Sequence, residues 1–202
     1  MIRVVLTGSE STGKSTVAAE LTAHFDASAL VPEFVRHFAA LKGAPIDFSD
    51  HGTIARGQMA LEDEQIARAP AVVIQDTDLL STVVYCVHYF GRCPAWIEEE
   101  AAARRPDLYL ICDVDVPWVP DGVRDREYAR GEMQALFRRA VTASGVPFVD
   151  IRGSRAERLN AAVAAVAAVR AMRDGPIDVR APQFPAKDDS NAEQQENGNG
   201  AE

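Results

Sequence analysis

The sequence predicts an α/β fold in which a five-stranded parallel sheet lies between two layers of helices. Apolar runs rich in β-branched residues alternate along the chain with helical patterns, which is typical of a parallel sheet with crossover helices. A glycine-rich segment directly follows the first apolar run, at the place where such folds bind phosphate groups. The chain has 202 residues, of which 47% are apolar, enough for one domain with a substantial core.

The glycine-rich segment, residues 8–15, is a complete phosphate-binding loop. The strand expected at 2–7 runs into Gly-Ser-Glu-Ser-Thr-Gly-Lys-Ser, which matches the pattern G-x-x-x-x-G-K-[ST]. Its glycines let backbone N–H groups turn toward phosphate oxygens, Lys14 would reach the β- and γ-phosphates, and the Ser15 hydroxyl would bind Mg²⁺. The motif predicts the P-loop NTPase fold, with strand order 2-3-1-4-5, and the cofactors ATP and Mg²⁺. The residues expected to bind ATP are Gly8, Ser11, Thr12, Gly13, Lys14, Ser15 and Thr16.

The remaining elements follow from the same alternation. Strands are expected at residues 2–7, 29–34, 71–76, 107–113 and 146–151, and helices at 14–25, 50–69, 79–90, 96–104, 127–143 and 155–172. Ser49 and Ser154 are expected to cap the second and the last of these helices, and Gly145 is a stop signal before the final strand. The last helix is rich in alanine and valine, which predicts that it packs against the sheet.

The composition changes after residue 173. Residues 174–202 hold seven acidic side chains against two basic ones, among many Pro, Asn, Gln and Gly residues. Such a segment cannot bury enough apolar surface to offset the entropy of ordering it. The sequence therefore predicts one P-loop domain over residues 1–173 and a disordered acidic tail over residues 174–202.

The net charge and the cysteines argue against several classes of protein. A formal charge of −9 without a basic patch makes nucleic acid and anionic membranes unexpected partners. We find neither a signal segment nor an apolar run of membrane length, so a cytoplasmic location is expected. Cys86, Cys93 and Cys112 are odd in number and form no C-x-x-C pair, which favours buried thiols over disulfides or zinc ligands.

Two carboxylates follow predicted strands at the sheet edge where ligands bind. Asp76 ends the third apolar strand, where P-loop proteins place their second Mg²⁺ residue, and Asp78 is a second candidate. Glu33, at the end of the second strand, is expected to orient the attacking hydroxyl of an acceptor, with Arg36 holding an anionic group nearby. The alternative is that Glu33 and Arg36 form only a surface ion pair. Their spacing does not decide between the two.

An arginine-rich loop follows the fourth predicted strand. Residues 117–126 read Pro-Trp-Val-Pro-Asp-Gly-Val-Arg-Asp-Arg, and Arg130 comes one helical turn after Arg126. Guanidinium groups such as those of Arg124 and Arg126 clamp phosphoryl oxygens and stabilise transition-state charge, which favours a lid over the triphosphate. The interleaved acidic residues leave open a solvated salt-bridge face.

These motifs together resemble the nicotinamide riboside kinase domain of bacterial NadR-type proteins. The resemblance covers about residues 1–172. It rests on the phosphate-binding loop, Glu33-Phe34-Val35-Arg36, Ile74-Gln75-Asp76-Thr77-Asp78 and Pro117-Trp118-Val119-Pro120-Asp121-Gly122-Val123-Arg124. The DNA-binding and nucleotidyltransferase domains of full-length NadR-type proteins are not expected in this chain.

The resemblance implies that ATP phosphorylates the 5′-hydroxyl of nicotinamide riboside, a small-molecule nucleoside, to give the mononucleotide used in NAD biosynthesis. Nicotinamide riboside carries a cationic ring, so Phe34 and Trp118 are expected to hold it by stacking and cation–π contact. Arg36 and Asp78 are further candidates for substrate contact. The active-site residues that the resemblance implies are Lys14, Ser15, Glu33, Asp76 and Arg124.

Two other interpretations remain open at this point. The chain could phosphorylate another nucleoside, a nucleoside monophosphate or an unrelated metabolite. It could instead be a regulatory switch in which nucleotide binding moves a loop and hydrolysis is slow. The sequence lacks the Asn-Lys-x-Asp base-reading motif of GTPases, which argues against the switch.

Overall fold

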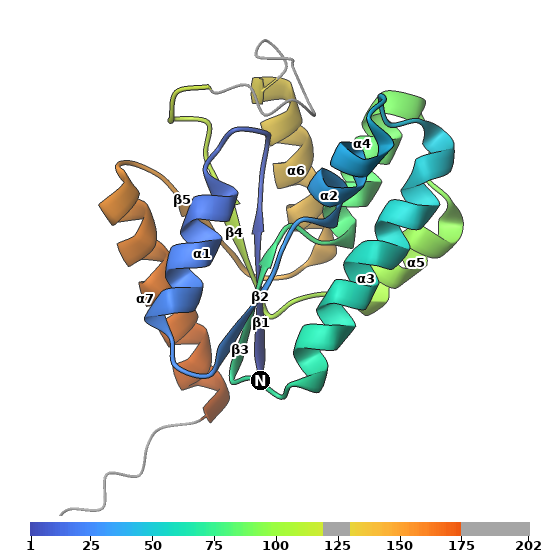
Figure 1. Ribbon diagram of the computed structural model, residues 1–202. Coiled ribbons are helices and arrows are strands. Elements are labelled where there is room, and N and C mark those ends of the chain that lie inside the picture. Colours follow the sequence, from blue (N-terminus) through green and yellow to red (C-terminus); the bar gives the residue numbers. More distant parts are fainter. Residues whose placement is uncertain (119–129, 175–202) are drawn as a thin grey trace, which may run out of the picture.

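A five-stranded sheet forms the centre of the computed structural model, which describes residues 1–118 and 130–174 (Figure 1). The strands are β1 (Ile2–Thr7), β2 (Ser28–Val31), β3 (Val72–Asp76), β4 (Leu108–Cys112) and β5 (Phe148–Ile151). They lie in the order β2-β3-β1-β4-β5, and all neighbouring pairs are parallel. The predicted fold class and strand order are therefore confirmed. The predicted tail begins at Asp174, which the structure describes as the last residue of α7, and the rest of the tail lies outside the described residues, as do the lid residues Arg124 and Arg126.

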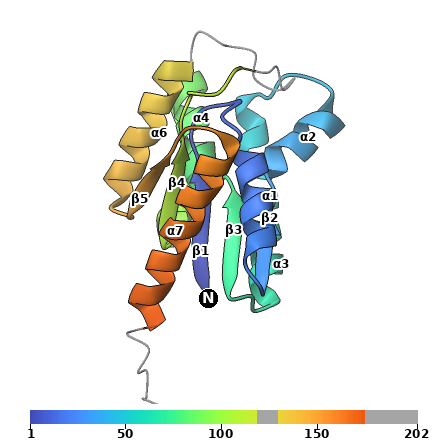
Figure 2. The ribbon, with the colours of Figure 1, turned by 90° about the vertical axis from the view of Figure 1, so that its left-hand side faces the viewer.

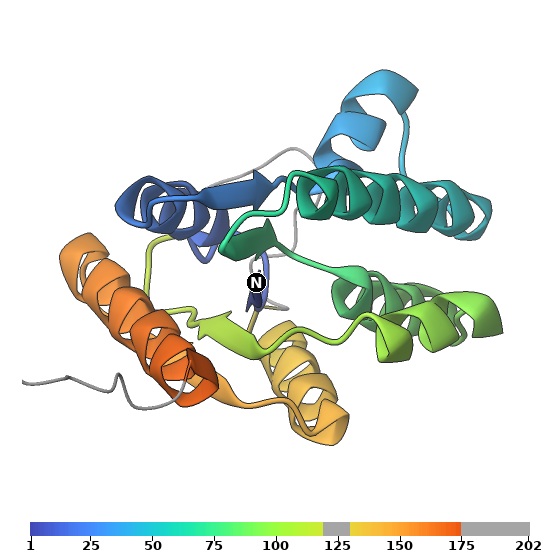
Figure 3. The same cartoon turned by 90° about the horizontal axis from the view of Figure 1, so that it is seen from below.

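Helices cover both faces of the sheet. They are α1 (Lys14–His24), α2 (Phe34–Lys42), the 3₁₀ turn η1 (Phe48–Asp50), α3 (His51–Ala67), α4 (Leu79–Phe90), α5 (Ala95–Ala103), α6 (Arg130–Ser144) and α7 (Arg155–Asp174). Figures 2 and 3 show α1 and α7 together on one face, with α3, α4, α5 and α6 on the other. No helix in the described ranges is both long and apolar enough to span a bilayer.

The strands are apolar on both faces because helices cover both. Side chains of a strand alternate between faces, so Val4 of β1 packs toward α1 and α7 while Val5 packs toward α6. Ala162 and Val166 of α7 are fully buried in the first of these clusters. The expectation that the last helix packs against the sheet is confirmed.

The structure corrects two details around α2. The expected strand at 29–34 ends at Val31, and the sequence prediction missed α2, which begins at Phe34. This helix has no side-chain cap at its start, so the usual N-terminal helix signal is missing there. The prediction that Ser49 caps the next helix is also wrong, because Asp47 forms the capping box of η1 and accepts the backbone N–H of Ser49.

Other local predictions agree with the structure. The Ser154 hydroxyl accepts the backbone N–H of Glu157 at 3.4 Å, as an N-cap does. Gly145 has a φ of +71° just beyond α6, the left-handed conformation that favours glycine after a helix. The three cysteines are free thiols. Because all strands are parallel, the loops that follow β1, β2, β3 and β4 open at the same edge of the sheet, and the candidate site lies there.

Candidate active site

The phosphate-binding loop connects β1 to α1 and encloses its own lysine. Gly8 has a φ of +122°, and a Cβ there would lie 2.6 Å from the carbonyl oxygen of Cys112, so only glycine fits. Gly13, with a φ of +77°, directly precedes α1. The Lys14 ammonium donates hydrogen bonds to the carbonyl oxygens of Gly8 and Ser9, at 3.0 and 2.6 Å. The lysine is thus held inside the loop and is only 4% exposed.

Two side chains from the C-terminal half of the chain hold this loop in place. Gln134 of α6 accepts the backbone N–H of Ser9 at 2.9 Å and donates to the carbonyl oxygen of Cys112 at 3.0 Å. Arg158 of α7, which is 3% exposed, donates to the carbonyl oxygen of Thr12 at 2.9 Å. No sequence motif singled out either residue, because each lies more than a hundred positions from the loop that it contacts.

A buried carboxylate lies beside the loop at the end of β3. Burial raises the pKa of the Asp76 carboxyl above its ordinary value, and the nearby Glu33 carboxylate raises it further. A hydrogen bond with Ser15 and the charge of Lys14 act in the opposite direction. Asp76 Oδ1 is buried and has no hydrogen-bond partner among the described residues. An orphaned carboxylate oxygen beside a serine hydroxyl fits Mg²⁺, which prefers oxygen ligands.

A cavity of about 510 Å³ lies over the loop and the start of α1. We call it the P-loop cavity, and its other lining side chains include Arg36, Val116, Pro117, Arg155 and Arg158. Its cationic groups and loop backbone suit a polyphosphate. Six of the residues predicted to bind ATP line it, namely Ser11, Thr12, Gly13, Lys14, Ser15 and Thr16.

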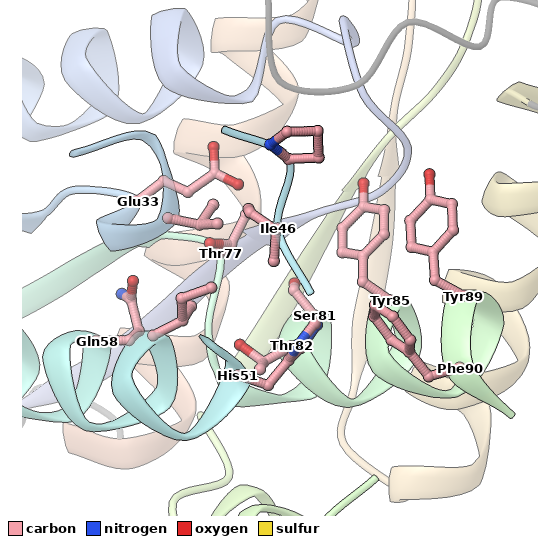
Figure 4. A pocket seen from close by; sticks show the side chains of 13 residues that line it. Glu33, Ile46, His51, Gln58, Thr77, Ser81, Thr82, Tyr85, Tyr89 and Phe90 are labelled. Atoms are coloured by element: carbon pink, nitrogen blue, oxygen red, sulfur yellow. The ribbon is translucent and has the colours of Figure 1, made fainter. Parts of the chain in front are cut away.

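A second cavity, of about 420 Å³, lies between α2, α3 and α4 (Figure 4). We call it the aromatic cavity, because three aromatic residues of α4 line it. Tyr85 and Tyr89 lie on the same side of α4, with near-parallel rings 6.2 Å apart, and Phe90 follows at the end of the helix. The full lining is Glu33, Val35, Pro45, Ile46, His51, Ile54, Gln58, Thr77, Ser81, Thr82, Tyr85, Tyr89 and Phe90.

Glu33 and Arg36 lie where the two cavities meet. Arg36 Nε donates to Glu33 Oε2 at 2.7 Å, so the ion pair considered from the sequence exists. It is not a simple surface pair, because the Glu33 side chain is 3% exposed and lines the aromatic cavity while Arg36 lines the P-loop cavity. Gln58 of α3 fixes this turn by accepting the backbone N–H of Phe34 at 2.9 Å.

The structure places three predicted substrate residues away from both cavity linings. The Phe34 ring packs on Gly57, so closely that a Cβ on this glycine would lie 2.2 Å from the ring. Asp78 caps α4 and accepts the Tyr109 hydroxyl at 2.6 Å, and burial raises its pKa to about 6. Trp118 is half-buried and lines neither cavity. The aromatic residues that line the second cavity come from α4, and the four-residue spacing of the two tyrosines was their only sequence signal.

The glycine loop, the parallel sheet and the adjoining cavities define a P-loop nucleotide-binding protein. The AAA domain family matches residues 3–158, and the chain belongs to this family. It is also similar to the trifunctional NAD biosynthesis/regulator protein NadR of Escherichia coli (strain K12), with 30% identity over 154 residues. The match to NadR of Salmonella typhimurium is 29% over 155 residues. These matches cover 73% and 74% of this chain but only 37% and 38% of the NadR proteins.

Solved structures share the fold. A NadR protein in complex with NR superposes with a TM-score of 0.66 and 22% identity, covering 83% of this chain and 49% of that one. Thymidylate kinase from Ehrlichia chaffeensis superposes with a TM-score of 0.60 and 17% identity, covering 84% of this chain and 98% of that one. The architecture is that of the P-loop kinases.

Proposed function

We propose that the chain is an ATP-dependent nucleoside-type kinase that phosphorylates the 5′-hydroxyl of nicotinamide riboside to give nicotinamide mononucleotide. The placement of Glu33 carries the proposal, because this buried carboxylate lies between a cavity suited to a triphosphate and a cavity suited to a small aromatic acceptor. Similarity to the NadR proteins supports the choice of acceptor, since one NadR structure holds NR and another holds NAD and AMP-PNP.

The chain's own residues would supply most of the catalysis by positioning and electrostatics. The loop and Lys14 would hold the β- and γ-phosphates. Ser15 and Asp76 would hold Mg²⁺, which when bound neutralises charge on the phosphates. Arg36, at the edge of the P-loop cavity, is placed to contact the transferred phosphoryl group. We assign the same task to Arg124 and Arg126, which lie outside the described residues.

Glu33 would orient the acceptor and receive its proton. It pairs with Arg36, and as a carboxylate it could accept a hydrogen bond from the 5′-hydroxyl. In a loose transition state the proton leaves late, so orienting the hydroxyl toward the γ-phosphate is the larger part of this role. Arg36 keeps the carboxylate aimed at the border between the two cavities.

The lining of the aromatic cavity supports a cationic or neutral nucleoside over a nucleoside monophosphate. Among the lining residues that the structure describes, Glu33 is the one acidic side chain, and there is no lysine or arginine. A monophosphate would need cationic partners there. The pyridinium ring of nicotinamide riboside would instead gain from the carboxylate and from the rings of Tyr85, Tyr89 and Phe90.

A comparison of acceptors tests this proposal. The full chain is incubated with ATP and MgCl₂ and with nicotinamide riboside, uridine, cytidine, thymidine or thymidine monophosphate. We expect a kcat/KM for nicotinamide riboside at least ~10-fold above that of the other acceptors, which corresponds to about 1.4 kcal/mol. A preference for the monophosphate would contradict the choice of acceptor. ATP hydrolysis that no acceptor accelerates would contradict the kinase itself.

A further inference from the structure

His51 contributes a polar group of known tautomer to the aromatic cavity. It is the first residue of α3, is 5% exposed and lines the cavity. Its Nδ1 lies 3.0 Å from the carbonyl oxygen of Asp47. A carbonyl oxygen can only accept, so Nδ1 carries the hydrogen. In the neutral ring Nε2 is then a hydrogen-bond acceptor.

The Nε2 atom is available to a ligand. Within residues 1–118 and 130–174 the structure gives it no hydrogen-bond partner. It is also not one of the fully buried side-chain nitrogens or oxygens that lack a partner in those residues. The ring is fixed from one side by Phe90, whose centroid lies 5.3 Å away in an edge-to-face arrangement. A fixed ring with one unused acceptor atom in a cavity is suited to recognising a donor group on a ligand.

His51 lies at the far end of the cavity from the proposed reacting hydroxyl. Figure 4 shows Glu33 at one end and His51 and Phe90 at the other. A nucleoside whose 5′-hydroxyl meets Glu33 would extend its ring toward Phe90 and His51. The substituent on that ring would therefore meet Nε2.

We propose that His51 selects acceptors whose heteroaromatic ring carries a hydrogen-bond donor, and in particular a carboxamide rather than the corresponding carboxylate. The proposal rests on the proposed function only for the identity of the acceptor. A carboxamide N–H can donate to Nε2 of a neutral ring, whereas a carboxylate has only acceptor atoms and can pair with Nε2 only if the ring first takes up a proton, which pH 8 disfavours. A site with a buried polar group rejects a ligand that leaves that group unpaired.

Two variants of His51 separate recognition from a merely structural role. In His51→Asn the side-chain amide can still donate to the Asp47 carbonyl, but nothing replaces Nε2. In His51→Gln the longer side chain brings an amide close to the former Nε2 position, where it can present either its oxygen or its NH₂ group to a ligand, while the bond to Asp47 is lost. Recognition through Nε2 requires the Asn variant to lose affinity for the carboxamide, and the Gln variant to keep that affinity while binding the carboxylate more tightly than the wild type does. A purely structural role requires Asn to behave like the wild type and Gln to be impaired.

The readout is binding, which does not depend on phosphoryl transfer. Dissociation constants of nicotinamide riboside and nicotinic acid riboside are measured by calorimetry at pH 8, without ATP, for the full chain and both variants. We expect the wild type to bind the carboxamide about 10-fold more tightly than the carboxylate, His51→Asn to bind the two within about twofold, and His51→Gln to bind the carboxamide within about threefold of the wild type. The difference between variants removes any preference that Glu33 alone creates, because both variants retain Glu33.

Several results would overturn the proposal: no preference in the wild type, an unchanged preference in His51→Asn, or no binding of either riboside. Loss of affinity for the carboxamide in both variants would also overturn it, unless thermal denaturation shows that His51→Gln is unfolded, in which case His51→Asn alone decides. Two other results would contradict the proposed function. Turnover of another nucleoside, with neither riboside bound, would reject the acceptor and leave a kinase. Selective binding without any turnover would leave His51 as a recognition residue in a protein that is not a kinase.

Discussion

The P-loop cavity and the aromatic cavity share the border at Glu33 and Arg36 but are built in different ways. The P-loop cavity consists mostly of one contiguous segment, whose backbone N–H groups, lysine and serine follow from a single motif. The aromatic cavity collects side chains from α2, α3, α4 and the segments before them, and almost all of its lining is apolar or neutral. One cavity is suited to a polyanion, and the other to an uncharged or cationic ring.

This difference shows what a motif can and cannot specify. The phosphate-binding loop needs particular backbone conformations, such as the φ of +122° at Gly8, and only a few residues allow them. The aromatic cavity needs only that side chains of suitable size face one another after the helices pack. Many residues meet that requirement, so binding chemistry can vary there while the loop stays the same.

The largest expected effect is at the P-loop cavity. Lys14→Ala should lower turnover at least ~100-fold, or about 2.7 kcal/mol, because the lysine charge follows the γ-phosphate into the transition state. Steady-state kinetics with nicotinamide riboside would measure it. Arg68→Ala, which removes an exposed cation paired with Glu64, is the matched control and should retain wild-type turnover. Near-normal activity of folded Lys14→Ala would contradict the assignment of the loop.

At the border between the cavities, Glu33→Gln should reduce kcat roughly 100-fold while the KM for ATP changes little. The substitution is nearly isosteric and removes the charge that orients the acceptor hydroxyl. Glu64→Gln breaks an exposed glutamate–arginine pair with Arg68 and should leave kcat unchanged. A lower melting temperature with unchanged kcat would mean that Glu33 serves only to hold Arg36.

Asp78 should affect stability rather than catalysis. Burial raises its pKa to about 6, so the folded chain binds this proton more tightly than the unfolded chain does. Ionising Asp78 therefore lowers the free energy of unfolding as the pH rises from about 4 to about 6. Asp78→Asn cannot ionise, and we expect its stability relative to the wild type to be about 2 kcal/mol higher at pH 7 than at pH 4.

Denaturant unfolding of Asp78→Asn and of the wild type at several pH values would measure this difference. The kcat of Asp78→Asn should stay within about twofold of the wild type. A large loss of activity would mean that Asp78 acts in substrate binding or catalysis.

The smallest expected effect is in the aromatic cavity. Tyr89→Ala should raise the KM for nicotinamide riboside about fivefold, or about 1 kcal/mol, and leave the KM for ATP unchanged, because it removes one ring that contacts the acceptor. Val87→Ala changes an exposed residue of the same helix outside the cavity and should have no effect. An equal rise of both KM values would mean that the two cavities do not bind separate substrates.

Much of the fold could be predicted from the sequence, and the reasons are local. Strands buried on both faces form continuous apolar runs, and the glycine loop fixes the start of the sheet. The start of α2 was hard to predict, because the helix lacks a side-chain cap and begins only three residues after β2 ends. The packing of the Phe34 ring on Gly57 could not be predicted either, since it depends on α3 lying alongside α2.

Some residues of the candidate site could be predicted from the sequence and others could not. Lys14, Ser15 and Asp76 could be placed from one motif and one strand end, and the structure brings them together. Gln134, Arg158 and His51 could not be placed. Each contributes through contacts that only the folded chain creates.

A crystal structure of the full chain with AMP-PNP, Mg²⁺ and nicotinamide riboside would test most directly the claim that the two cavities hold donor and acceptor on either side of Glu33. We predict the triphosphate on the loop beside Lys14, the ring of the acceptor in the aromatic cavity, and its 5′-hydroxyl within hydrogen-bond distance of Glu33. An acceptor bound outside the aromatic cavity, or one whose 5′-hydroxyl points away from Glu33, would contradict this account.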